Sequence, residues 1–340
     1  MKKRRKLLVT TFCSLLLILF TLHQLWAESQ KKSSIIISEI CFLPKDGEPE
    51  WIELKNISSK QVNIAGWQIT NGEILNIVLP KGLLNMPPHA HVLIIFDGRG
   101  DTEFRSEIND LSFDEDKLVV LHTPSELCGD ILGDTAAGEC SLYAAGERKA
   151  NSIRSFVVWG HKPSTKNMVA DAVNGRLWRY RSDSLVVDSS PAVIIGGPIA
   201  MIKPGGSIGL YGDCRGTRLD DWLVYKPAES TPGEENPLPA PLLYLPSNGT
   251  HITRIEGPQN LTFSWGRIRG ATSYHFQLCE DLECGTVAID APNCEGPYYT
   301  AEMLSANVYY WRVSSTTGDL GRKSKWSSTN KLIFGYPKVR

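Results

Sequence analysis

The sequence has little net charge, no paired cysteine motifs and only one long apolar run, and each absence excludes a class of function. Its 340 residues carry 36 Lys and Arg against 37 Asp and Glu, a formal net charge of -1. This balance lacks the basic footprint typical of nucleic-acid binding. The eight cysteines form no C-x-x-C pairs of the kind that hold zinc. The 42% hydrophobic content nevertheless predicts real cores, in two or three ordinary domains.

The one long apolar run lies at the N-terminus and predicts export. Residues 1–6 contain five basic side chains, residues 7–22 are largely apolar, and Ala27 precedes polar sequence. This order is typical of a secretory signal peptide, so we expect residues 1–27 to be removed and the body to be extracellular, periplasmic or at the cell surface. The alternative is that the run stays as a single transmembrane anchor, the only membrane association expected. Cleavage would leave 31 basic against 37 acidic residues, a net charge of -6.

Export into an oxidising compartment would permit disulfide bonds among the seven cysteines that remain. The nearest candidate pairs are Cys128 with Cys140 and Cys279 with Cys284, while spacing alone leaves the connectivity open. The odd number means that at least one thiol stays free or pairs between chains.

The mature chain is dominated by short runs with β-strand alternation, separated by Gly, Pro and Asn turns. We therefore predict an all-β fold of two immunoglobulin-like antiparallel β-sandwiches after the N-terminal signal segment. Dense proline at residues 227–246 predicts a linker that overlaps both flanking domains, residues 33–237 and 240–337. The first domain is long for one sandwich, so we expect an insertion at about 123–198. The best helix candidate is residues 167–177.

In residues 50–55 of the first domain, Ile52 and Leu54 share one strand face, while Trp51, Glu53 and Lys55 share the other. Similar strand patterns recur in residues 35–40, 50–56, 62–69, 87–94 and 221–233. Together these segments resemble the lamin tail domain, an immunoglobulin-like sandwich of nuclear lamins and many exported bacterial proteins.

Aromatic side chains alternate along the strands expected in the second domain. Phe263 and Trp265 share one strand face, and two further strands show the same alternation. Such faces packed together would form a sandwich interior. With this pattern in residues 261–265, 270–278, 309–313 and 325–327, the domain resembles a fibronectin type III-like module of bacterial exported proteins.

The motifs that could carry chemistry are few. Ser207 lies in a G-x-S-x-G pattern, but the residues after it favour a strand rather than the helix that a nucleophile elbow needs. His89 and His91 lack a third metal ligand, so we expect both to face solvent. The densest basic and aromatic cluster, a candidate patch for an anionic glycan or polyphosphate, also fits an amphipathic strand. Its residues are Arg176, Trp178, Arg179 and Arg181.

The sequence thus predicts no catalytic, cofactor-binding or metal-binding residues and no enzyme activity. We expect an exported binding or scaffolding protein of the cell envelope or extracellular space, with a protein or glycan partner whose identity is unknown and no nucleic-acid partner. The alternative is an accessory binding-domain protein of a secreted hydrolase system.

Overall fold

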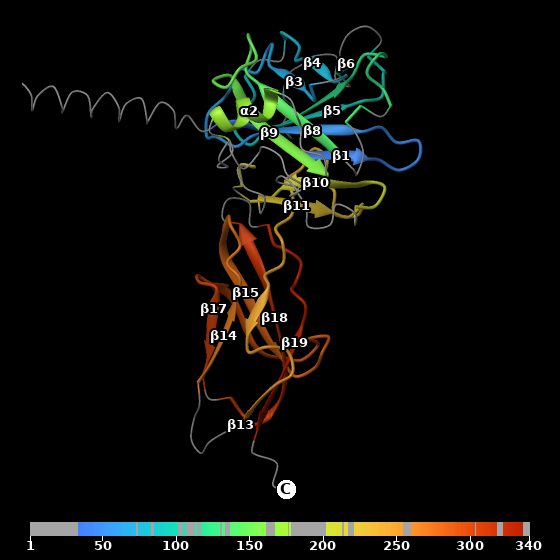
Figure 1. Ribbon diagram of the computed structural model, residues 1–340. Helices are drawn as coiled ribbons and strands as arrows, with labels where there is room; N and C mark the ends of the chain where they lie inside the picture. Colours follow the sequence, from blue (N-terminus) through green and yellow to red (C-terminus); the bar gives the residue numbers. More distant parts are fainter. Residues whose placement is uncertain are drawn as a thin grey trace, which may run out of the picture. The chain divides into compact units, whose positions relative to one another are not determined.

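The structure is a computed structural model in which β-strands dominate (Figure 1). Within the part of the chain that it describes, no helix combines the length and apolar character needed to cross a membrane. The predicted signal segment, residues 1–27, lies outside the described residues. The described residues are 33–72, 74–82, 85–100, 105–106, 113, 117–129, 131–132, 137–160, 167–175, 177, 202–212, 214–216, 221–253, 260–302, 304–317 and 322–335.

The first sandwich contains a seven-stranded and a four-stranded sheet. The larger sheet has the order β11 (Trp222–Tyr225), β10 (Gly206–Leu210), β1 (Ile35–Leu43), β2 (Trp51–Asn56), β5 (His91–Ile95), β7 (Leu118–His122) and β6 (Arg105–Ser106). All its pairs are antiparallel except β5 with β7. The smaller sheet has the order β4 (Asn76–Val78), β3 (Gln68–Thr70), β8 (Ala137–Tyr143) and β9 (Ile153–Gly160).

Alternating apolar side chains from both sheets build one core. Ile52 and Leu54 of β2 are fully buried in it, as their alternation predicts. Phe42 of β1 stacks on Trp159 of β9 with ring centroids 4.6 Å apart, which joins the two sheets.

The region predicted as an insertion contributes to this sandwich. The β8–β9 hairpin supplies two of the four strands of the smaller sheet, so residues 137–160 are integral to the fold. The predicted helix is present and shorter than expected, as α2 (Asn167–Asn174). Met168 and Ala172 of α2 are buried against Phe156.

The second sandwich pairs a three-stranded with a five-stranded sheet. The smaller sheet has the order β12 (Leu243–Leu245), β14 (Leu261–Trp265) and β17 (Tyr298–Ala301). The larger has the order β13 (Thr250–Thr253), β19 (Asn330–Gly335), β18 (Asn307–Thr317), β15 (Ala271–Cys279) and β16 (Val287–Cys294). Together the two sandwiches confirm the predicted all-β fold.

Aromatic side chains fill the second core where the alternation places them. The Phe263 ring lies 4.9 Å from Phe276 and 5.2 Å from Trp311, measured between centroids. All three side chains are fully buried. Their contact joins β14 to β15 and β18, so it holds the two sheets of this sandwich together.

Of the two candidate disulfides, the structure contains Cys279–Cys284, which closes the turn after β15. The other pair differs from the prediction, because Cys128 and Cys140 are both free thiols. Cys140 is buried in β8, whereas Cys128 lies at an exposed position beyond β7. Closeness in the sequence therefore does not bring these two sulfurs together.

Candidate functional site

The outer face of the seven-stranded sheet carries ionisable side chains that are buried. In β2, Glu53 and Lys55 point away from the core because they alternate with Ile52 and Leu54. In the sheet register Glu53 lies opposite Glu39 of β1, and Lys55 lies opposite His91 of β5. Four ionisable groups from three neighbouring strands therefore meet on one face.

A register shift in β1 sends Glu39 to this outer face. Ile37 pairs with Leu54 and Glu39 pairs with Glu53, which leaves Ser38 as an extra residue between them. One extra residue reverses the alternation that follows, so Glu39 points outward while Ile40 returns to the core. The Ser38 hydroxyl donates a 2.5 Å hydrogen bond to Glu53 Oε1.

Residues 230–238, which we call the closing segment, cover this face. The Ser230 hydroxyl donates to Glu39 Oε1 at 3.0 Å, and the Gly233 amide donates to Glu53 Oε2 at 2.7 Å. Gly233 has a φ of 85° and lies so close to Leu118 that a Cβ would be 2.9 Å from that side chain, so this turn requires glycine. Part of the predicted proline-rich linker is therefore packed on the sheet.

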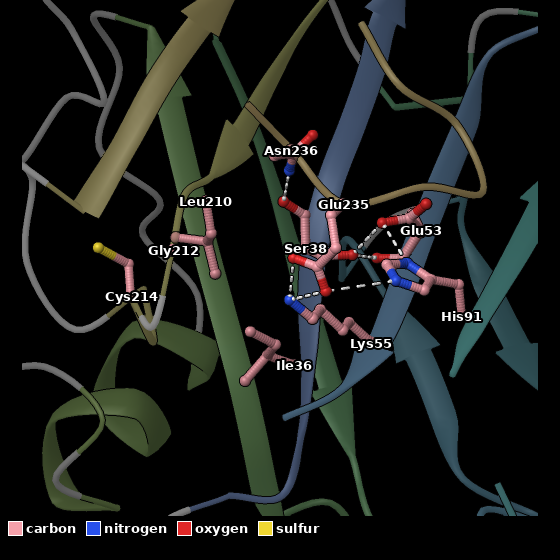
Figure 2. A pocket seen from close by; sticks show the side chains of 10 residues that line it. All are labelled: Ile36, Ser38, Glu53, Lys55, His91, Leu210, Gly212, Cys214, Glu235 and Asn236. Atoms are coloured by element: carbon pink, nitrogen blue, oxygen red, sulfur yellow. Dashed lines mark hydrogen bonds and ion pairs between the residues drawn. The ribbon is translucent and has the colours of Figure 1, made fainter. Parts of the chain in front are cut away.

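Glu235 of the closing segment supplies the last charge of the cluster. Figure 2 shows its carboxylate between the Lys55 ammonium and the His91 ring. Lys55 Nζ lies 2.5 Å from Glu235 Oε2, and His91 Nε2 lies 3.7 Å from Glu235 Oε1. On its other side, His91 Nδ1 lies 3.0 Å from Glu53 Oε1. We call Glu39, Glu53, Lys55, His91 and Glu235 the ionic cluster.

Burial and neighbouring charges shift the protonation of the ionic cluster. Burial, with the facing Glu53 charge, raises the pKa of Glu39 to about 7, although hydrogen bonds from Ser207 and Ser230 oppose this. Burial alone would lower the pKa of His91, but its contacts with Glu235 and Glu53 outweigh that effect and raise it to about 9. Burial by itself would raise the pKa of Glu235. The contacts with His91 and Lys55 outweigh burial and lower this pKa to about 2.

These shifts leave the ionic cluster balanced in weak acid. With Glu39 protonated and His91 charged, two carboxylates face two cations. Above about pH 7 the Glu39 carboxyl ionises opposite Glu53 and adds one unbalanced negative charge. The cluster is therefore best satisfied below neutrality.

The cavity at the cluster is too small for an organic ligand. It encloses about 10 Å³ between the sheet and the closing segment, roughly the room that one water molecule needs. The charged side chains that line the cavity contact one another, which leaves room for protons and one water molecule only. These contacts fasten the closing segment to the sheet.

Two residues of the sequence motifs, Ser207 and His91, lie at this cluster. Ser207 is buried in β10, in a strand as predicted, and its hydroxyl donates to Glu39. His89 is exposed, but the expectation that His91 faces solvent is wrong, because the closing segment covers it. The basic and aromatic patch, Arg176, Trp178, Arg179 and Arg181, lies outside the described residues.

Among the described residues, no three His, Cys, Asp or Glu side chains come together as a set that could hold a metal ion.

The sequence reasoning missed Glu39, Glu53 and Glu235. A glutamate between apolar strand residues looks like an ordinary solvent-facing residue, because alternation says nothing about what covers the outer face. One signal was available: Glu39 interrupts an apolar run that is otherwise buried on both sides.

Among known proteins, one family matches the part of the chain that forms most of the first sandwich. Residues 28–148 match the family model of the Lamin Tail Domain, and the match ends in the turn between β8 and β9. No curated protein matches the chain. The match covers the first sandwich from β1 to β8, and a second β-sandwich follows it in the chain.

Solved structures resemble the chain only loosely. A β-1,2-glucanase from Parabacteroides distasonis is 15% identical with a TM-score of 0.22, over 30% of this chain and 13% of its own length. An Fn3-like protein from Clostridium thermocellum is 21% identical with a TM-score of 0.19, over 30% of this chain and 91% of its own. The chicken CNTN1 FN1–FN3 domains are 11% identical with a TM-score of 0.21, over 87% and 97%. TM-scores this low do not define a fold. The fold of the second sandwich follows from its own strand order.

Proposed function

We propose that the protein is a non-enzymatic binding or scaffolding protein, exported to the cell envelope or extracellular space, whose sandwich modules contact a protein or glycan partner. The observation that supports this most is the closed ionic cluster. Its carboxylates and histidine would be the obvious candidates for acid–base chemistry, yet they form ion pairs with one another and with Lys55 beneath the closing segment.

Two features support the exported location. The basic and apolar order of residues 1–27 is that of a signal peptide. The Cys279–Cys284 disulfide fits an oxidising compartment, where such bonds persist. N-terminal sequencing of the exported product tests this step. A product that still begins at residue 1 would show that the segment is not cleaved and would favour a membrane-anchored protein over a secreted one.

The absence of catalysis is tested with the purified mature chain and a panel of ester, glycoside and phosphodiester substrates. We expect no turnover above that of the variants Ser207→Ala and His91→Asn. A hydrolytic activity that either substitution abolishes would overturn the proposal.

Binding is tested by passing the mature chain over immobilised glycans and by capturing proteins from the producing cell. A captured protein counts only if it binds again after purification. Co-purification with a hydrolase would favour the alternative, an accessory binding protein of a secreted hydrolase system.

A further inference from the structure

The three-stranded sheet of the second sandwich has an uncharged outer face. Its strands β12, β14 and β17 contain no Asp, Glu, Lys or Arg, in a chain that is 21% charged. Phe263, Trp265 and Ala301 point inward and are buried. On the outer side, by contrast, the side chains of Tyr244 and Tyr298 are 56% and 60% exposed. Large exposed aromatic residues on a sheet face are a recognised mark of an interaction site.

Each of these tyrosine rings lies against a glycine. A Cβ at Gly266 would be 3.1 Å from Tyr244 Oη, and a Cβ at Gly296 would be 2.9 Å from Tyr298 Cε1. The glycines therefore let the rings lie close to the backbone, as flat surfaces rather than upright side chains.

The two rings belong to neighbouring parts of one sheet. Ser264 of β14 pairs with Tyr298, and the hydrogen bond from Trp265 N to Pro297 O, 3.0 Å long, continues that register. Continued by one residue, this register places Gly266 opposite Gly296, so Tyr244 of β12 and Tyr298 of β17 lie on either side of β14.

A row of hydroxyl groups continues the same face. Thr262 of β14 lies opposite Thr300 of β17, and their Oγ1 atoms are 3.0 Å apart. Both threonines are exposed, and Ser264 is half-buried between them and the rings. The face thus combines flat aromatic surface with neutral groups that both donate and accept hydrogen bonds.

We propose that this face binds a neutral glycan chain, with Tyr244 and Tyr298 stacking on the apolar faces of sugar rings and the hydroxyl row contacting their edges. A sugar ring presents both kinds of surface, whereas an anionic polymer would require the cations that these strands lack. Proline-rich peptides bind in grooves lined by aromatic residues, whereas this surface is the face of a sheet. The inference rests on the proposed binding function and names its ligand class.

The test uses the full mature chain and its retention on immobilised dextran, mannan and microcrystalline cellulose. Tyr244→Ala and Tyr298→Ala should each weaken retention on at least one of them by roughly tenfold, the loss typical of a binding hot spot. Tyr298→Phe keeps the stacking surface and should stay near the parent protein. Leu282→Ala is the matched control, because Leu282 is a similarly exposed apolar residue outside this sheet.

Unchanged thermal unfolding of the variants shows that the fold is intact. The glycan proposal is overturned if no neutral polysaccharide retains the parent protein, or if the tyrosine variants and Leu282→Ala behave alike. It is also overturned if polygalacturonate or oligoproline binds this face instead, or if the tyrosine substitutions dissolve a dimer. In each of these cases the protein capture described above decides separately whether the wider binding function stands.

Discussion

Replacing Glu39 with Gln should remove a pH-dependent loss of stability from the first sandwich. The Glu39 carboxyl is fully buried opposite Glu53, and its pKa is raised to about 7. Gln keeps an oxygen for the Ser207 and Ser230 hydroxyls and resembles the neutral acid in size. Its amide group takes the place of Oε2, where the Thr231 hydroxyl can rotate to accept.

The size of the effect follows from the shift of the pKa. The folded protein holds the Glu39 proton up to about pH 7, against the ordinary value of 4.5. A raised pKa means that the stabilisation is complete below 4.5 and is lost as the pH rises through 7. At about 1.4 kcal/mol for each pH unit, the loss approaches ~3 kcal/mol. The Glu39→Gln variant should not show this loss. Its free energy of unfolding should therefore exceed that of the parent protein by an amount that grows between pH 4.5 and about pH 7 and then stays constant.

Urea unfolding followed by tryptophan fluorescence, repeated from about pH 4.5 to about pH 8.5, measures this difference. His91 affects both proteins alike, so the gap between the two curves isolates Glu39. The unfolding of the second sandwich, which contains no residue of the ionic cluster, is the internal reference. Parallel curves for the two proteins would refute the reasoning.

Three further substitutions test other parts of the structure. His91→Asn removes one of the two cations that face the buried carboxylates and should cost about 3 kcal/mol in urea unfolding below pH 6.5, a loss that fades as the pH rises through 9; a pH-independent loss would contradict the charge assignment. Replacing both Cys279 and Cys284 with Ser should cost about 2 kcal/mol, since the closed loop is short, and a thermal scan showing no change would argue against the bond. Gly138→Ala should destabilise the first sandwich by about 1–3 kcal/mol in urea, because its Cβ would overlap the Trp159 ring; an unchanged midpoint would contradict that packing.

Much of the fold could be predicted because its signals are local. The two-residue spacing of Ile52 and Leu54 predicts the core face of their strand. The spacing of Phe263 and Trp265 does so in the second sandwich. The Cys279–Cys284 bond could be named as a candidate for a similar reason, since its cysteines are only five positions apart across one turn. The same argument from closeness failed for Cys128, which lies in a separate, exposed segment.

The ionic cluster could not be predicted because its contacts are not local. The Ser230 hydroxyl reaches Glu39 across 191 positions, and the Gly233 amide reaches Glu53 across 180. Proline density predicted a linker there, but not that part of it would pack on a sheet.

By itself, the sequence determined the class of fold and the faces that form the cores, because strand alternation acts over a few residues. It named Cys279–Cys284 as one of two candidate disulfides and left the choice between them open. Tertiary structure alone decided that a shifted register turns Glu39 outward and that a distant segment buries it with His91 and Glu53. The physical reason is that alternation assigns a side chain to a face, while its charge state depends on what later covers that face.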